Sequence, residues 1–254
     1  FRNRGLQVEI SAGRLLDAEV EEATARIGDL EKPVVQVKGR AKGPGASLWQ
    51  ALQTSPVGQD LAEDLPELRI SGASRLNLEL TIPTDARSSQ ARGRVELLDN
   101  HIALPAWNLE LDRLRGEVSF TEAGLEAREL QTRLRGEPVR LDLDLVGREG
   151  RRDLRARLRG RPGWRALLGE SMAKALERTV GGKSLWDAVL TVPIHRRERR
   201  DDSPPFRLDL NSDLRGTAVR LPAPLGKTAS ESRPLKISLY PHERATLALT
   251  LDYG

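Results

Sequence analysis

Two short motifs of the sequence contain residue types that could perform catalysis or bind phosphate, and each is incomplete. Gly182-Lys183-Ser184 is similar to the end of a phosphate-binding Walker A loop, but Glu177 stands where that motif requires an earlier glycine. Gly169-Glu-Ser-Met-Ala173 has the spacing of a nucleophile elbow. It lies within a helical pattern, however, whereas the elbow needs a sharp strand-to-helix turn. We therefore interpret both motifs as structural.

The ionisable residues also form no catalytic or metal-binding pattern. His101, His195 and His242 are far apart in the sequence, and none belongs to an H-E-x-x-H motif. Asp142 and Asp144 would share one face of a strand, as a calcium or acid–base site requires, but their alternation with leucines favours solvated charges. The chain has no cysteine, which excludes disulfides, cysteine-ligated zinc and thiol catalysis. The sequence predicts no catalytic residue, no metal site, no cofactor and no enzyme activity.

Composition narrows the class further. The 254 residues include 41 Lys and Arg against 37 Asp and Glu, a formal net charge of +4. These charges are interleaved, whereas a nucleic-acid binder clusters its basic residues on one face, so we expect no nucleic-acid partner. No stretch approaches the ~20 apolar residues of a membrane-spanning helix. Aromatic residues make up only 4% of the chain.

Alternation of apolar and polar residues is the dominant pattern, and it predicts strands with one apolar and one charged face. Val139-Arg-Leu-Asp-Leu-Asp-Leu145 is the clearest example. Short spacers with Gly, Asn or Pro separate these runs, as hairpins require. We expect about 15 strands in a long antiparallel meander. The predicted strands include residues 76–82, 107–111, 114–120, 125–134, 139–145, 154–158, 206–210 and 235–239.

Two segments interrupt this alternation and predict helices. Ser47 can serve as the N-cap of a short helix that includes Trp49 and Leu52, within a segment that prolines divide before Leu68. Residues 164–180 place apolar side chains at helical spacing, and Gly181-Gly182 is a suitable stop. This second helix either covers part of an apolar groove or fills it. The helical residues that we expect at the rim are Trp49, Leu52, Trp164, Leu168, Met172 and Leu176.

The two helices also reveal an internal duplication. Each contains the pattern W-x-A-L, at Trp49 and at Trp164, and each precedes a strand with G-x-S, L-T and a terminal proline at identical spacing. These strands are 72–83 and 182–193, so the block occurs approximately at 33–105 and again at 154–222. Repeats of this kind stack into extended arrays. The chain ends within a strand-like pattern, so we expect a segment of a longer protein.

The apolar stripe permits two interpretations. Its side chains are buried by a second layer, as in a sandwich or barrel, or they line an open trough. Leucine dominance, scarce aromatics and the repeated array favour the trough, which would suit acyl chains. Each methylene transferred from water contributes about 0.8 kcal/mol. The side chains predicted to line it are Leu76, Leu78, Leu80, Ile82, Leu109, Leu111, Val118, Phe120, Val139, Leu141, Leu143, Leu145, Leu154, Leu158, Phe206, Leu208 and Leu210.

A longer motif resembles a known family. Ser212-Asp-Leu-Arg-Gly-Thr-Ala-Val-Arg-Leu-Pro-Ala-Pro-Leu-Gly-Lys227 is similar to a recurring segment, S-D-L-x-G-x-x-x-x-L-P-x-P-x-x-K, of YhdP-type proteins in the AsmA-like superfamily. The stretches 53–56, 114–121 and 134–138 also resemble that family. The similarity extends from about Leu15 to Pro234.

That resemblance implies a fold and a function. YhdP-like proteins are large envelope proteins of Gram-negative bacteria, with an inner-membrane anchor and a periplasmic, taco-like β-sheet around a hydrophobic groove. They are understood to move phospholipid toward the outer membrane as bridges. This chain would then be a mainly-β, elongated, curled antiparallel sheet over residues 1–254, an interior piece with an apolar groove and two short helical insertions. Its implied partners are phospholipid acyl chains, the rest of the polypeptide at both ends, and both membranes through segments outside this chain.

Rival interpretations remain open at this point. A structural β-solenoid or adhesion module that binds carbohydrate or protein would need a filled interior and exposed aromatics, and a hydrolase of envelope polymers would need a catalytic constellation. The arginine-rich stretches 148–161 and 195–200 either contact anionic lipid headgroups or form a solvated hairpin and a linker, and we favour the second interpretation.

Overall fold

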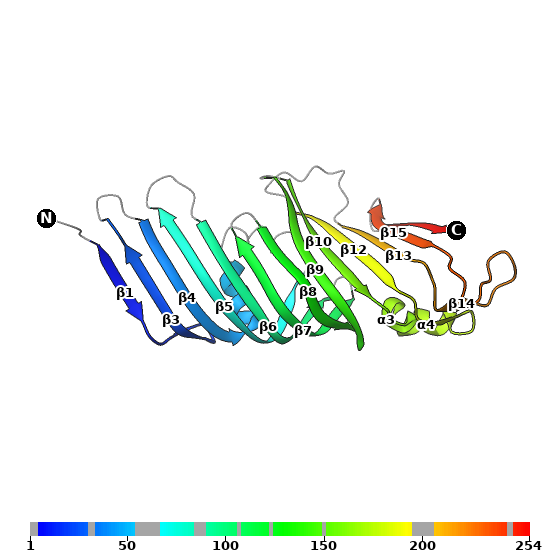
Figure 1. Ribbon diagram of the computed structural model, residues 1–254, viewed down its shortest axis with the longest axis horizontal. Coiled ribbons are helices and arrows are strands. Elements are labelled where there is room, and N and C mark those ends of the chain that lie inside the picture. The colour runs from blue at the N-terminus through cyan, green and yellow to red at the C-terminus, as the bar shows by residue number, and fades with distance from the viewer. Residues whose placement is uncertain are drawn as a thin grey trace. The chain divides into compact units, whose positions relative to one another are not determined.

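A computed structural model describes residues 5–29, 34–53, 67–83, 90–105, 108–121, 124–148, 151–194, 206–242 and 246–254 (Figure 1). Strands dominate these residues. The bounds of the strands are β1 Leu6–Ile10, β2 Gly13–Leu15, β3 Ala18–Ile27, β4 Val34–Pro44, β5 Arg69–Pro83, β6 Gln90–Leu104, β7 Leu109–Thr121, β8 Gly124–Leu134, β9 Glu137–Arg148, β10 Arg151–Gly160, β11 Val180–Gly182, β12 Trp186–Ile194, β13 Arg207–Ser212, β14 Thr217–Val219, β15 Leu235–His242 and β16 Thr246–Tyr253. The helices are α1 Gly45–Gln53, α3 Trp164–Leu168 and α4 Glu170–Leu176.

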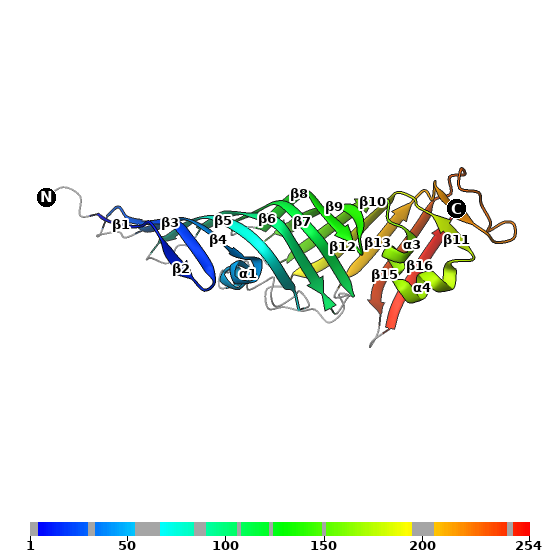
Figure 2. The same cartoon turned by 90° about the horizontal axis from the view of Figure 1, so that it is seen from below.

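The strands follow one another in space almost as they do in the sequence. The order across the large sheet is β1-β3-β4-β5-β6-β7-β8-β9-β10-β12-β13-β15-β16, with β2 beside β3, while β11 and β14 form a separate pair (Figures 1 and 2). The sheet has 14 strands and is not closed. The prediction of a mainly-β chain with a curled antiparallel sheet and a few short helices is confirmed. An open meander of this kind is not a solenoid.

The contacts divide the chain into two compact units. Unit 1 comprises residues 1–108 and 113–128, and unit 2 comprises residues 109–112 and 129–254. We describe each unit separately, because β7 and β8 contribute residues to both.

In unit 1, the register of the strands aligns apolar residues into rows across the sheet. Leu80 of β5 lies between Val37 of β4 and Ala91 of β6, and Val37 faces Ala25 of β3, which faces Val8 of β1. Alternate side chains of a strand share a face, so neighbouring rows repeat every second residue. The other rows are Leu6–Ile27–Val35–Ile82, Ile10–Ala23–Gly39–Leu78–Gly93 and Val20–Ala41–Leu76–Val95.

Unit 2 is built in the same way. Leu143 of β9 begins a row that crosses β10, β12, β13, β15 and β16. We call it the Leu143 row, and its members are Leu143, Ala156, Leu190, Leu208, Leu239 and Leu249. The rows beside it are Leu141–Leu158–Ala188–Leu210–Ile237–Leu251 and Leu145–Leu154–Val192, and the row beyond Leu141 is Val139–Gly160–Trp186.

Three strands change their alternation at a residue with positive φ. Asp99 in β6, Arg113 in β7 and Glu129 in β8 have φ values of 75°, 52° and 52°. Opposite Asp99, the pairing of β5 with β6 slips between Ser71 and Ala73, which is a β-bulge. Arg113 separates the buried Leu111 from the buried Leu114, although these residues are three apart. A bulge therefore returns the apolar side chains to the same face after an odd step.

The helices differ from their predictions at their boundaries. The predicted single helix over 164–180 is two helices, because Gly169 has φ 78° and ψ 171° and interrupts it between α3 and α4. Val180 and the Gly181-Gly182 pair belong to β11 and not to a helix stop. Ser47 is not an N-cap, because α1 begins two residues earlier at Gly45. The Trp107 end of the predicted strand 107–111 and most of segment 54–68 lie outside the described residues.

A glycine, with a serine two residues later, recurs after each helical segment: Gly72 and Ser74 lie within β5, whereas Gly182 ends β11 and Ser184 precedes β12. Gly72 and Gly182 have φ values of 95° and 99°, and Ser74 and Ser184 are almost fully buried. The Ser74 hydroxyl accepts a hydrogen bond from Asn100 Nδ2 at 3.0 Å, and the Ser184 hydroxyl accepts one from Thr217 Oγ1 at 3.1 Å. These environments accord with the predicted duplication, which remains a prediction.

Candidate functional site: the apolar faces of the two units

The predicted lining residues lie on the apolar face of the unit to which each belongs. In unit 1, Leu76, Leu78 and Leu80 are half-buried members of three consecutive rows, while Ile82 is 39% exposed. Phe120 is buried and its ring lies over Gly93, because a Cβ at Gly93 would lie 2.7 Å from Phe120 Cε1. Val118, two residues away on β7, is half-buried. The face of unit 1 is thus partly covered and partly open.

In unit 2, burial distinguishes two groups of the predicted residues. Leu111, Val139 and Leu141 are at most 6% exposed, so they belong to the packed core. The remainder keep part of their surface exposed. These half-buried residues are Leu109, Leu143, Leu145, Leu154, Leu158, Phe206, Leu208 and Leu210. An aliphatic surface that is neither sealed nor freely exposed can accept a nonpolar ligand without a polar or catalytic group.

Each unit has a helix against one end of its apolar face. Figure 2 shows α1 beside β4 and β5 of unit 1. There Ser47 and Leu48 are buried, and Gly45 fits closely, since a Cβ on it would lie 2.9 Å from Ile70 Cγ2. Trp49 of α1 is half-buried, and the side chain of Leu52 lies outside the described part of the chain.

In unit 2, α3 packs on a buried cluster at the end of the Val139 row. Trp186, Leu214 and Leu235 form the cluster, and Trp164 and Leu167 of α3 pack against it. The rings of Trp164 and Trp186 meet edge to face, with 5.4 Å between their centroids. Of the other helical residues predicted at the rim, Leu168 and Leu176 are half-buried, whereas Met172 is 57% exposed. The helix α3 therefore fills this end of the face, and α4 presents Met172 to solvent.

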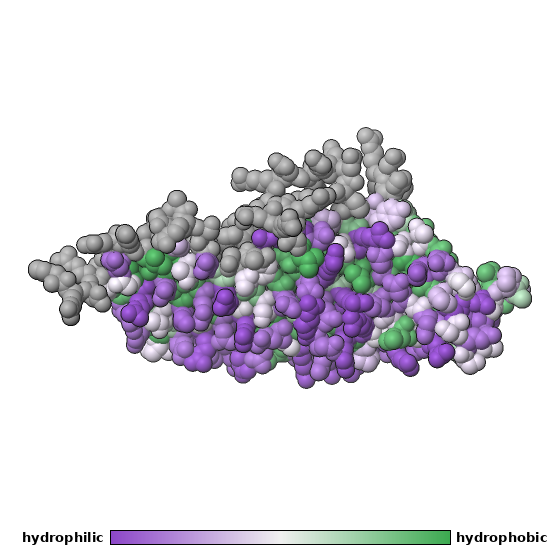
Figure 3. Space-filling view, turned by 45° about the horizontal axis from the view of Figure 1, so that its top comes forward, coloured by the Kyte–Doolittle hydropathy of each residue, from purple (hydrophilic) through white to green (hydrophobic). Residues whose placement is uncertain are grey.

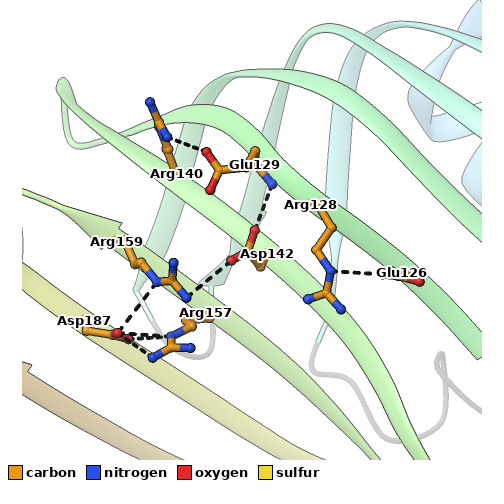
Figure 4. A network of polar contacts seen from close by, with 8 residues as sticks. All are labelled: Glu126, Arg128, Glu129, Arg140, Asp142, Arg157, Arg159 and Asp187. Carbon is orange, nitrogen blue, oxygen red and sulfur yellow. Dashed lines mark hydrogen bonds and ion pairs between the residues drawn. The ribbon is translucent and has the colours of Figure 1, made fainter.

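The opposite face carries ion pairs between neighbouring strands. In unit 2, Arg157 Nη2 and Nε contact the two carboxylate oxygens of Asp187 at 2.6 and 2.8 Å, and Arg159 lies 3.9 Å from Asp142 (Figure 4). Asp142 also accepts the backbone N–H of Glu129 at 2.8 Å. In unit 1, Lys38 of β4 forms an ion pair with Glu79 of β5, with 2.8 Å between Nζ and Oε1. Hydrophilic side chains cover much of the surface in Figure 3, with hydrophobic patches between them.

These charges are structural partners and not a reactive site. Hydrogen bonds from Arg207 and Ser238 keep the pKa of Asp209 below its ordinary value, against the opposing effect of burial. The hydrogen bond to Asp187 raises the pKa of Arg157. Both shifts stabilise the charged form, whereas a general acid or base needs a pKa near the working pH. Among the described residues, no group of three or more His, Asp or Glu could hold a metal ion.

The two incomplete motifs have structural roles in unit 2. Lys183 pairs with Glu137 at 2.5 Å, and a Cβ at Gly182 would collide with the backbone oxygen of Gly216. Gly169 separates two helices, and Ser171 is exposed on α4. Arg155, Arg157 and Arg159 of β10 alternate onto the charged face, whereas Arg152 has the same parity as Leu154. Residues 195–200 lie outside the described residues.

The motif from Ser212 to Lys227 forms a hydrogen-bonded excursion between β13 and β15. Lys227 is 6% exposed, and its ammonium donates to the carbonyl oxygens of Leu214 at 2.9 Å and Thr228 at 2.8 Å, and also to that of Thr217. Burial lowers the pKa of Lys227. The Ser212 hydroxyl donates to the carbonyl of Leu185 at 2.7 Å. The first and last side chains of the motif thus both donate hydrogen bonds to backbone carbonyls.

Sequence reasoning omitted several residues of the apolar faces. Leu114 and Leu130 are almost fully buried, and Leu190 and Leu239 belong to the Leu143 row. The signal for Leu190 and Leu239 was present, because both lie in alternating segments. The signal for Leu114 and Leu130 was present as well, because Leu114 alternates in phase with Val118 and Phe120, and Leu130 with Thr132 and Leu134.

Comparisons with known proteins agree with the motif. A family model described as YhdP protein matches residues 1–254. The intermembrane phospholipid transporter YhdP of Escherichia coli (strain K12) is 25% identical over 241 residues, which are 94% of this chain and 18% of that relative. The chain therefore spans less than a fifth of the relative's length. No solved structure matches. No helix among the described residues is long and apolar enough to cross a membrane.

Proposed function

The chain belongs to the YhdP family, and on this premise we propose that the apolar faces of its two units bind phospholipid acyl chains and carry them as part of an intermembrane transporter. The observation that supports the proposal is the set of half-buried aliphatic rows, above all the Leu143 row, whose members from β9 to β15 are neither sealed nor freely exposed. The curated relative is named as an intermembrane phospholipid transporter.

The mechanism needs no chemical step. Acyl chains would replace water over the leucine rows, at a gain of about 0.8 kcal/mol for each methylene fully transferred. The charged headgroups would remain in water, since the aliphatic rows supply no partner for them. A ligand that is held by surface contact and not by directed bonds can slide from one row to the next. Transport in this proposal is therefore passive and non-enzymatic.

The wider setting of the proposal follows the family. The chain would be one segment of a periplasmic bridge, continued by the rest of its polypeptide, between the inner and outer membranes.

Native mass spectrometry of the chain purified from bacteria, followed by lipid extraction, tests the acyl-chain site. We expect co-purified phospholipid in the unmodified protein and its loss in the Leu143→Asp, Leu208→Asp double variant, because a carboxylate in the row makes burial of acyl chains unfavourable. Both positions are half-buried, so the fold should tolerate the change.

The matched control is Leu185→Asp, because Leu185 is 53% exposed and lies outside the strand rows. It makes the same chemical change and should retain lipid. Circular dichroism would establish that both proteins are folded. Unchanged lipid content in a folded double variant would refute the proposal.

A further inference from the structure

The rows of the apolar face in unit 2 differ in how well they are covered. In the Val139 row, Val139 and Trp186 are 6% and 3% exposed. On the other side, Val192 and Ile194 of β12 are 1% and 3% exposed. Between these margins, the members of the Leu143 row from β9 to β15 are all half-buried, and Leu249 on β16 is 60% exposed. Most members of the two adjoining rows, those of Leu141 and Leu145, are half-buried as well.

The margin at Trp186 is closed by α3. The rings of Trp164 and Trp186 meet edge to face, and Leu167 packs on the same cluster. Leu210 and Ile237, which belong to the row of Leu141, also pack against this cluster. A ligand that lies on the Leu143 row would thus find its path toward Trp186 occupied by protein side chains.

From this difference we infer that α3 is a plug that excludes acyl chains from the Trp186 end of the face and leaves them on the half-buried rows, of which the Leu143 row is the central one. Trp164 is the positioning residue, because its indole supplies the large ring that meets Trp186. The helix α4 is not part of the plug, since its Met172 is 57% exposed. The inference rests on the proposed function and specifies which part of the face the lipid occupies.

Hydrogen bonds define the two ends of the short helix α3 and connect it to the rest of unit 2. It begins after Gly163, where the backbone N–H of Ala166 donates to the Gly163 carbonyl at 3.0 Å, and it ends at Gly169. The carbonyl of Ala166 also accepts the guanidinium of Arg135 at 2.8 Å. The hydrogen bond from Arg135 and the Trp164–Trp186 contact hold α3 on the sheet.

Photo-crosslinking tests this inference without altering the protein. The purified chain is loaded with a phosphatidylcholine that carries a diazirine near the end of one acyl chain, and the adducts are located by tandem mass spectrometry after illumination. We expect adducts on Ala156, Leu190, Leu208 and Leu239, and none on Trp164, Trp186 or Leu214.

Two variants then test the role of the plug. Trp164→Ala should extend the adducts to Trp186 and Leu210, whereas Met172→Ala should leave the pattern unchanged. Leu167→Ala, a smaller change on the same helix, should give a weaker extension and keeps the test available if Trp164→Ala does not fold. The adduct pattern separates a plug from a purely structural role, because loss of stability alone would not redirect labelling.

The possible outcomes distinguish failure of the plug from failure of the proposed function. Adducts on both the Leu143 row and Trp186 in the unmodified protein would overturn the plug and leave the proposed function standing. No adducts on the apolar face would overturn both. Row adducts that Trp164→Ala and Leu167→Ala leave unchanged in folded protein would also overturn the plug.

Discussion

At the scale of single residues, the most consequential side chain outside the apolar faces is that of Lys227. Its buried ammonium satisfies the carbonyl oxygens of Leu214, Thr217 and Thr228 together. A buried polar group that loses its partner retains its full desolvation cost. Lysine at the end of the recurring motif is thus required by the backbone that it connects.

Lys227→Met should lower the free energy of unfolding by about 2–4 kcal/mol, because it removes the donor and leaves buried carbonyls unsatisfied. Urea denaturation followed by circular dichroism measures the change. Lys236→Met, an exposed lysine on β15, is the control and should shift the free energy by less than about 0.5 kcal/mol. Equal effects of the two substitutions would contradict the structural role of Lys227.

The glycines of the apolar face differ in the space around them. A Cβ at Gly93 would lie 2.7 Å from Phe120 Cε1, whereas one at Gly39 would lie 3.5 Å or more from its neighbours. Gly93→Ala should therefore destabilise unit 1 by about 1–3 kcal/mol through overpacking. Gly39→Ala should be neutral or stabilise by about 0.5 kcal/mol, because glycine weakens a strand. Thermal denaturation compares them, and a more harmful Gly39→Ala would refute the packing account.

At the scale of elements, alternation predicted most strands and the two faces. Leu143, Ala156 and Leu190 face the same side because the strand period is two, which sequence can display. The period fails where a residue adopts a positive φ. Asp99 stands in an Asp-Asn pair that is typical of turns, whereas Arg113 and Glu129 are residue types that seldom adopt this conformation.

The sequence also could not predict which residues of the apolar face are buried and which are half-buried. Leu141 and Leu143 belong to the same run of alternating leucines, yet Leu141 is buried and Leu143 is half-buried. Coverage depends on what packs above each row, and that is a tertiary contact. The sequence predicts a helix that begins at Trp164, but it does not predict the contact of Trp164 with Trp186.

Pairing between strands on the charged face gives a further prediction. Arg157 and Asp187 connect β10 to β12 with a bidentate contact, and both side chains are partly exposed. A double-mutant cycle with Arg157→Ala and Asp187→Ala should give a coupling of about 0.5–1 kcal/mol, because water screens such pairs. In 1 M salt the coupling should decrease. A coupling above about 3 kcal/mol would show that the pair is desolvated, against its exposure.

At the scale of the whole molecule, both units combine a charged face with aliphatic rows, so the proposed lipid ligand would be recognised by its nonpolar part. Affinity should then depend on acyl-chain length and hardly at all on the headgroup. Dihexanoyl- and dioctanoyl-phosphatidylglycerol share a headgroup and differ by four methylenes.

Isothermal titration below their micelle concentrations should show tighter binding of the dioctanoyl lipid. Four methylenes contribute at most about 3 kcal/mol, which corresponds to roughly a hundredfold in the dissociation constant. The gain should be smaller where the row leaves a methylene in contact with water. Glycerophosphoglycerol, the headgroup without chains, should show no measurable binding. Binding of that headgroup alone, or equal affinity for the two lipids, would mean that the charged residues hold the ligand and that the leucine rows serve only to fold the sheet.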